Sequence, residues 1–580
     1  MDMLGVTASL SERRWMAPDA HIVRHAEALS QKTDRHTALC TVLARLGVEA
    51  DDVEAYLAPE LRSLLPDPRS LRDMEQAAAR ICHAMRHNER IAIFADYDVD
   101  GATSAAQLIW WLRSFGQTAT LYVPDRIDEG YGPNRPAMEQ LAQSHDLIIC
   151  VDCGTLSHEP IAAAQGADVV VLDHHLGGET LPPALAVVNP NRQDETGDLA
   201  HLCAAAVVFL TLVEAGRQLR EANVQGPNLM DYLDLVALGT VADVAPLIGV
   251  NRAFVRQGLR VMGRRTRPGL VALSDVAKID SAPTAYHLGY ILGPRINAGG
   301  RVGQADLGAK LLSSDDLRFC QNAAEQLEIL NTDRRTIESH VREAALAQAE
   351  ARGFQAPLVW AADDGWHAGV VGIVASRLKE ATNRPTIVIG FDQDAGKGSG
   401  RSVTGIDLGA AIQKLAAEGL IEKGGGHKMA AGLSLSRDQL EPAMARLSEL
   451  MAKQGAGDMG PADLRIDSVL HIAAATPELI TLLDAAGPYG AGVSGPRFAI
   501  PSVSITFAKT VGAGHLKFTC ADETGARLEG IAFGAMDGPL GPVLTQNDGQ
   551  KLHLAGRIEL NRWGGRETVQ LRLEDAAIAN

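Results

Sequence analysis

The chain has 580 residues, of which 46% are hydrophobic and 22% are charged. This length is too great for a single hydrophobic core, so we expect a globular chain of roughly three or four domains. Neither the apolar run of a signal peptide nor the ~20 apolar residues of a membrane span is found, which predicts a cytoplasmic protein without a membrane partner. Seven thinly spread cysteines predict reduced thiols rather than a disulfide framework.

The net charge of −17 is unfavourable for contact with phosphate groups, which bind to Lys and Arg. However, a metal site rich in carboxylates adds negative charge that bound cations offset, and a narrow groove needs basic residues only in its own lining. Within 251–270, where no acidic residue occurs, an arginine recurs every four residues and predicts one candidate basic surface. These arginines are Arg252, Arg256, Arg260 and Arg264. On a helix these would share a face, either merely solvated or in contact with nucleic acid.

Residues 1–75 contain short helical pieces broken by Pro66 and Pro68 and carry no chemical motif, so we expect a packing or substrate-guiding segment. Residues 76–265 are predicted to form an α/β domain with a doubly wound parallel sheet, because short β-branched runs alternate with helix-like stretches. The expected strands are 91–95, 118–123, 147–151, 169–172 and 186–188. Ligand groups in such sheets lie beyond the carboxyl ends of the strands.

Residues 266–355 are predicted to be connecting helices, since 305–352 are rich in helix-forming residues and lack proline. A second α/β domain follows at 356–455, with expected strands at 358–361 and 386–390 and a helix at 370–381. After a Gly- and Pro-containing break at 455–461, residues 462–580 predict a β-barrel of the OB type. Its expected strands include 503–507, 515–519, 551–557 and 568–573.

Acidic and imidazole side chains follow the predicted strands of the first domain, and one more follows a helix-like stretch. These residues are Asp96, Asp98 and Asp100, then Asp152, then Asp173, His174 and His175, and finally Asp243. Hard oxygen and imidazole donors brought to one sheet edge make a site for two divalent cations.

Other interpretations of these residues are weaker. A lone Asp after a strand is usually a helix cap or turn former, but four clusters are not explained in that way. The Asp-x-Asp-x-Asp-Gly run is similar to a calcium loop, yet its twelfth position is Gln107 and it follows a strand. Cys150 and Cys153 lack a second Cys or His pair, so burial on a strand is favoured over a zinc or redox role.

The ordered motifs resemble those of the DHH phosphoesterase family. They are Asp-Tyr-Asp-Val-Asp-Gly at 96–101, Val-Asp-Cys-Gly at 151–154, Asp-His-His at 173–175 and Gly-Thr-Val-Ala-Asp at 239–243. Further motifs resemble the members that digest single-stranded DNA: 123–126, 129–132, 293–301, 366–375, 399–402 and 424–427. The resemblance extends from about residue 75 to the end, and the sequence departs from the family's pattern at 487–493.

This resemblance implies that Asp98, Asp100, Asp152, His174 and Asp243 ligate two divalent cations, Mn²⁺ or Mg²⁺, with Asp96 as a further ligand. Asp152 is the expected bridge between the two ions. His175 would face the phosphate and Asp173 would orient a histidine. Two such ions can activate water for phosphodiester hydrolysis.

A pocket for a terminal 5′-phosphate is predicted from guanidinium and hydroxyl donors, because guanidinium forks match phosphate oxygens. Its candidates are Arg126, Arg295, Ser399 and Arg401, and the other expected substrate-binding residues are Asn297, Arg301, His367, Gly426 and His427. Glycine runs are also common turns, and Trp366 with His367 would either stack on a base or pack in the core. Residues 390–397 do not fit a Walker loop, so no ATP is implied.

The resemblance therefore implies a 5′→3′ exonuclease that hydrolyses single-stranded DNA to 5′-mononucleotides in DNA repair and recombination. It implies a monomer, with a helicase and a single-strand-binding protein as candidate partners. An alternative is a phosphodiesterase for cyclic dinucleotides or short oligonucleotides, although the barrel and connecting helices give a long polymer more surface. A non-catalytic binding protein is disfavoured by the intact acid and histidine set.

Overall fold

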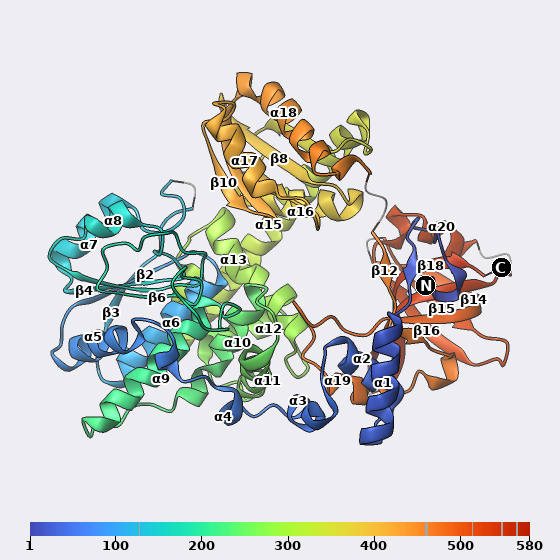
Figure 1. Cartoon of the computed structure of the whole chain (residues 1–580), viewed down its shortest axis with the longest axis horizontal. Helices are drawn as coiled ribbons and strands as arrows, with labels where there is room; N and C mark the ends of the chain where they lie inside the picture. Colours follow the sequence, from blue (N-terminus) through green and yellow to red (C-terminus); the bar gives the residue numbers. More distant parts are fainter. Residues whose placement is uncertain (127, 459–461, 513, 547–548, 564–565, 580) are drawn as a thin grey trace. The chain divides into compact units, whose positions relative to one another are not determined.

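The computed structural model describes residues 1–126, 128–458, 462–512, 514–546, 549–563 and 566–579 (Figure 1). Residues 459–461 of the predicted 455–461 break therefore lie outside the described residues. Backbone contacts divide the chain into two units. One contains Met1–Glu60, Gly460–Tyr489 and Val493–Asn580, and the other contains Leu61–Met459 and Gly490–Gly492.

A parallel five-stranded sheet organises the larger unit, in the order β3-β2-β4-β5-β6. Its strands are β2 (Ile91–Ala95), β3 (Ala119–Tyr122), β4 (Leu147–Val151), β5 (Asp168–Leu172) and β6 (Ala186–Val188). The predicted parallel sheet is thus confirmed. Strand order reverses direction between β2 and β4, which is the position where ligands bind in sheets of this kind.

Helices cover both faces of this sheet, as its alternating buried side chains require. Ile91, Ile93 and Ala95 belong to the core formed with α5 (Met74–Arg86), α6 (Val99–Ser114), α9 (Ala204–Glu221) and α10 (Leu233–Ala242). Ala92 and Phe94 belong to the opposite core, formed with α7 (Arg135–Ser144) and α8 (His158–Ala162). The sheet is therefore doubly wound.

A run of helices leads to the second α/β domain. They are α11 (Gly249–Met262), α12 (Pro268–Val276), α13 (Gly293–Val302), α14 (Leu307–Ser313) and α15 (Leu317–Arg352). The 36 residues of α15 extend about 54 Å at the usual helical rise. The four arginines predicted to share a basic helix face do so only in part. Arg252 is buried, with 2% of its surface exposed, and Arg264 lies beyond the end of α11.

The second domain has a mixed sheet in the order β10-β11-β9-β8-β7, in which only β7 and β8 are parallel. Its elements are β7 (Val359–Asp364), α16 (Ala368–Thr382), β8 (Thr386–Asp392), β9 (Ala395–Arg401), α17 (Leu408–Ala417), β10 (Lys423–His427), β11 (Ala430–Ser436) and α18 (Leu440–Lys453). The glycines at 424–426 lie in β10 and are not a turn. Gly426 has φ +149°, and a Cβ there would be 2.4 Å from the carbonyl oxygen of Ala430.

The smaller unit contains a closed barrel, which confirms the predicted OB-type fold. Five strands close it through an extra pairing of β14 with β17. They are β14 (Phe498–Val511), β15 (His515–Ala521), β16 (Arg527–Ala532), β17 (Leu552–Trp563) and β18 (Arg566–Ile578).

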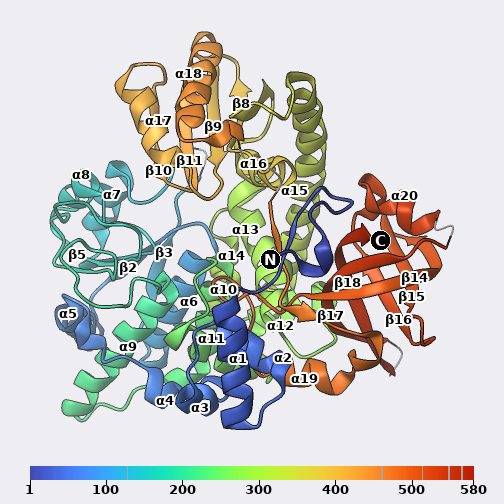
Figure 2. The same ribbon diagram turned by 45° about the vertical axis from the view of Figure 1, so that its right-hand side comes forward.

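The first 60 residues fold with this barrel, an association that no sequence pattern indicates. β1 (Trp15–Met16) pairs in parallel with β12 (Leu464–Arg465), and the buried Trp15 indole donates to Asp575 at 2.9 Å. The helices α1 (Ala20–Thr33) and α2 (Thr37–Arg45) share a core with α19 (Pro477–Asp484), beside which they lie in Figures 1 and 2. The 1–75 segment predicted from sequence thus spans parts of both units.

All seven cysteines are buried and unpaired, including Cys150 and Cys153. Burial raises the pKa of the Cys150 thiol above its ordinary value. Within the described ranges, no helix is both long and apolar enough to span a bilayer.

Candidate active site

The strand ends bring the predicted acids and histidines to the switch point of the sheet. Asp96 follows β2, Asp152 follows β4, and residues 173–175 follow β5. Asp98 caps α6, since its carboxylate accepts hydrogen bonds from the backbone N–H groups of Asp100 (2.8 Å) and Gly101 (3.1 Å). A Cβ at residue 101 would lie 2.3 Å from the Asp96 carbonyl oxygen, so this tight turn requires glycine.

Asp152 is buried and has φ +60°, a left-handed conformation that is uncommon outside glycine. Its backbone is held on both sides: its N–H donates to the Leu172 carbonyl at 3.0 Å, and its carbonyl accepts from the Tyr131 hydroxyl at 2.9 Å. Backbone strain that neighbouring groups maintain in this way is typical of functional positions.

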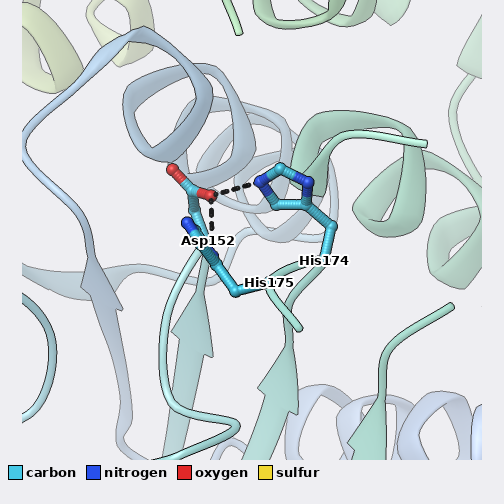
Figure 3. Close-up of side chains that lie close together, drawn as sticks. All are labelled: Asp152, His174 and His175. Carbon is cyan, nitrogen blue, oxygen red and sulfur yellow. Dashed lines mark ion pairs between the residues drawn. The ribbon is translucent and has the colours of Figure 1, made fainter. Parts of the chain in front are cut away.

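His174 lies among three of the carboxylates. Its Nε2 is 3.2 Å from Asp152 Oδ1 and 3.7 Å from Asp100 Oδ2, while its Nδ1 is 3.8 Å from Asp243 Oδ2. Figure 3 shows the His174 and His175 rings converging on the Asp152 carboxylate, with His175 Nδ1 3.9 Å from Oδ1. Donors from four separate segments therefore converge, as the sequence predicted.

These donors fit a divalent cation. Three overlapping groups have ligand atoms within 4.8 Å of one another: Asp152 with His174 and His175, Asp100 with His174 and Asp243, and Asp96 with Asp98 and Asp152. Three buried atoms of the set, Asp96 Oδ1, Asp152 Oδ1 and His174 Nε2, have no hydrogen-bond partner in the described part of the chain. Because unsatisfied buried polar atoms are costly, a cation is the natural partner for them.

Electrostatics lead to the same conclusion. Burial, followed by the charges of neighbouring acids, raises the pKa of Asp96 and Asp152 well above the ordinary range. Burial and the Asp100 carboxylate raise the pKa of Asp243 to about 9. Carboxylates crowded in this way are poor acids without a cation and good ligands with one.

Asp173 plays a different part, because hydrogen bonds occupy its carboxylate. Oδ1 accepts from the His174 N–H (2.7 Å) and lies 2.8 Å from His175 Nδ1, while Oδ2 accepts from the Thr155 N–H (3.0 Å). Although burial opposes it, these bonds hold the pKa of Asp173 below its usual range. Burial would lower the pKa of His175, but Asp173 outweighs it and raises that pKa to about 9. In the metal-free site, Asp173 therefore favours the protonated form of His175.

Tyr131 belongs to this site, although the sequence motif that contains it suggested no role. Its hydroxyl lies 3.0 Å from His175 Nδ1 in addition to its bond to the Asp152 carbonyl, and the residue is 51% exposed. Two flanking glycines, Gly130 and Gly132, have φ +87° and +75°. A tyrosine between glycines on a loop beyond a strand end was the available signal.

A cavity of about 320 Å³ lies against the metal-binding groups and has a basic side formed by Arg126 and Arg301, with Asn297 beside them. The Arg126 guanidinium lies over the Tyr97 ring, 5.0 Å from its centre. Burial and the charge of Arg126 lower the pKa of Arg301 to about 10. The same two causes lower the pKa of Arg401 and of His367, so these groups are electrostatic neighbours of Arg126.

Ser399 and Arg401 meet on β9, where the Arg401 guanidinium donates to the Ser399 hydroxyl at 3.0 Å. The His367 ring accepts from the Gly369 N–H at 3.0 Å and caps α16. Trp366 is 7% exposed and packs in the core of the second domain, which rules out base stacking by this residue.

Six predicted substrate-binding residues do not belong to the lining of this cavity: Arg295, His367, Ser399, Arg401, Gly426 and His427. The Arg295 guanidinium forms an ion pair with Glu328 and donates to the Ile291 carbonyl at 2.7 Å, so internal groups already engage it. Spacing in the sequence does not distinguish such a structural arginine from one that faces a ligand.

Family models match the three folded regions. The DHH family N-terminal domain matches residues 90–240, the DHHA1 domain matches 355–453, and the RecJ OB domain matches 466–575. Together with the acid and imidazole cluster at the sheet edge, these matches define a protein of the DHH class. A single-stranded-DNA-specific exonuclease RecJ of Dickeya dadantii (strain 3937) is 38% identical over 542 residues, which cover 89% of this chain and 92% of that protein. The chain belongs to the RecJ family.

Solved structures agree with this assignment. RecJ from Thermus thermophilus in complex with Mn²⁺ has a TM-score of 0.80 and 28% identity, covering 97% of this chain and 79% of that one. The same protein in complex with Mg²⁺ has a TM-score of 0.74 and 26% identity, with coverages of 97% and 78%.

Proposed function

We propose that this protein is a metal-dependent exonuclease that hydrolyses single-stranded DNA from its 5′ end to 5′-mononucleotides. The observation that carries the proposal is the cluster of buried acid and imidazole atoms, without hydrogen bonds to any described residue, beside an arginine-lined cavity. The specificity for single-stranded DNA follows the exonuclease to which the chain is 38% identical. Action in DNA repair and recombination follows from that activity.

Two divalent cations, Mn²⁺ or Mg²⁺, would be held by Asp98, Asp100, Asp152, His174 and Asp243, with Asp96 as a further ligand. When bound, they supply positive charge to the phosphate and acidify a coordinated water. His175, charged and oriented by Asp173, is placed to stabilise negative charge that develops on the phosphate.

Digestion in a single direction requires recognition of one end of the strand, because the metal ions would act in the same way on every phosphodiester. Arg126 with Arg301, which line the cavity together, and Arg401 with the Ser399 hydroxyl that it contacts, are suited to a terminal 5′-phosphate. The sequence predicts Arg295 in this pocket, but its guanidinium forms an ion pair with Glu328. We therefore propose that Arg301 binds the phosphate instead.

The test is digestion of single-stranded oligonucleotides labelled at either end, with Mn²⁺ and with a chelator. Mononucleotides should appear from the 5′ end, and only with metal. Blunt duplex and cyclic di-AMP serve as comparison substrates, and preferential cleavage of cyclic di-AMP would reject the proposal. A helicase or single-strand-binding protein as partner and a monomeric state remain predictions from sequence.

A further inference from the structure

A second basic cavity of about 410 Å³ lies beside the first. It is formed by α13, α15 and α16, which lie together in Figure 2. The residues that matter are Arg301, Arg334, Arg335, Arg342, Arg377 and Tyr290. Asn297 and Arg301 line both this cavity and the one at the metal-binding groups, so the two are neighbours across these side chains.

The charge of this cavity is unbalanced. Its described lining contains a single carboxylate, Glu338, which lies 2.5 Å from Arg334 and 3.8 Å from Arg377. Arg335 and Arg342 are exposed and form no hydrogen bond or ion pair with any described residue. Five guanidinium groups therefore face one carboxylate within the lining.

Arg334 is the most constrained member of the set. It is 8% exposed, and its buried Nε has no hydrogen-bond partner in the described part of the chain. Burial lowers its pKa, and the charges of Arg335 and Arg377 act in the same direction. Glu338 accompanies Arg334 and raises its pKa, but this one carboxylate does not offset the charges of the other arginines of the lining, which favours an additional anion here.

An exposed aromatic ring lines this cavity, and a second ring stacks on it. Tyr290 is 67% exposed and Tyr286 is 50% exposed, and their rings stack with centres 5.1 Å apart and planes at 27°. Exposed aromatic faces beside guanidinium groups are the usual means by which proteins hold single-stranded nucleic acid without regard to its sequence.

We propose that this cavity binds the phosphate of a further nucleotide of the substrate strand, whose base lies against Tyr290. The inference rests on the proposed function and adds a subsite next to the terminal-phosphate groups, with which it shares Arg301. We favour the substrate strand over the released mononucleotide as the ligand. The excess positive charge and the stacking surface of the cavity would hold a mononucleotide and slow its release as product. Substrate length then becomes a determinant of affinity.

The test uses the Asp152→Ala protein, so that binding is measured without cleavage. In this background Arg335→Ala and Arg342→Ala are combined, and binding of a decanucleotide and of thymidine 5′-monophosphate is measured by anisotropy and by competition. We expect affinity for the decanucleotide to fall about ten-fold, equivalent to about 1.4 kcal/mol, with no change for the monophosphate. Arg318→Ala is the matched control, an exposed arginine about 25 Å away along α15.

Unchanged affinity for the decanucleotide would overturn the inference. So would an equal loss for thymidine 5′-monophosphate, which would make the cavity a product site. Thermal melting confirms that the double variant is folded, and Tyr290→Ala supplies an independent variant with the same expected result. Cleavage by the unmodified protein is measured separately, so failure of the exonuclease proposal is distinguishable from failure of this subsite.

Discussion

At the residue scale, Asp152 is a side chain on which the metal site depends. It takes part in two of the three ligand groups, and its left-handed backbone is one that Asn also tolerates. Asp152→Asn should therefore lower Mn²⁺-dependent cleavage at least about 100-fold while the melting temperature stays the same or rises. Asp146→Asn, at a surface ion pair with Arg90, is the control and should be fully active. Near-normal activity of the Asp152 variant would contradict the assignment.

Tyr131 should act through the groups that its hydroxyl touches. Tyr131→Phe removes the bond to the Asp152 carbonyl and the contact with His175, so we expect kcat to fall about ten-fold with little change in KM for DNA. More Mn²⁺ should be needed for half-maximal rate. Tyr232→Phe is a matched control at a buried tyrosine that is absent from the cavity lining. A rise in KM without loss of kcat would show that the ring, not the hydroxyl, matters.

The raised pKa values make metal binding depend on pH. Because burial and Asp100 raise the pKa of Asp243 to about 9, the metal-free site holds protons at pH 7 that a cation must displace. Mn²⁺ affinity should therefore rise with pH up to about 9. Calorimetric titration in two buffers of different ionisation enthalpy should show net proton release at pH 7, and a result independent of buffer would exclude this coupling.

The raised pKa of Asp243 also determines whether the metal-free protein gains or loses stability as the pH rises. Between the ordinary carboxyl pKa of 3.8 and about 9, the folded metal-free protein holds a proton on Asp243 that the unfolded chain has released. Its contribution to the free energy of unfolding therefore falls as pH rises through that window. Chelator-treated protein should lose less stability between pH 6 and pH 8 when Asp243 is replaced by Asn, as thermal melting would show.

At the element scale, β9 carries the residues expected to read the strand end. Arg401→Ala should remove a charge-assisted contact of about 1.5–3 kcal/mol, so use of 5′-phosphorylated ends should fall about ten- to hundred-fold. Ends with a 5′-hydroxyl should suffer much less. Initial rates on both substrates test this, and an unchanged ratio between them would mean that Arg401 only braces Ser399 and its strand.

Sequence patterns predicted the elements that position the metal site, because β-branched runs flanked by helix-like stretches are locally encoded. Asp96, Asp152 and His174 could thus be placed at strand ends before any geometry was known. The strand at 424–426 could not be predicted, since its glycines lack the side chains that mark a strand and are held by β11 instead. The ion pair that engages Arg295 joins residues 33 apart on two helices, and such long-range pairing leaves no local signal.

At the scale of the whole molecule, every residue assigned to the metal site lies in Leu61–Met459. A protein restricted to 61–459 should therefore bind Mn²⁺ and cleave short oligonucleotides. It should bind a decanucleotide and a dinucleotide with a smaller difference in affinity than the full chain does, because the barrel is absent. Anisotropy and rate measurements on both lengths test this, and retention of the full difference would assign length dependence to the larger unit alone.

The pairing of the first 60 residues with the barrel has a consequence for synthesis on the ribosome. Trp15, Leu39 and Leu43 are fully buried in the completed unit, yet part of the core around them comes from strands and helices that begin only after residue 459. At about 5–20 residues per second, the intervening 399 residues take about 20–80 s to emerge. During that interval the nascent N-terminus exposes apolar side chains while the catalytic region folds behind it. The beginning of this chain is therefore among the last parts to reach its native structure, and its yield in the cell should depend on chaperones that shield nascent apolar segments.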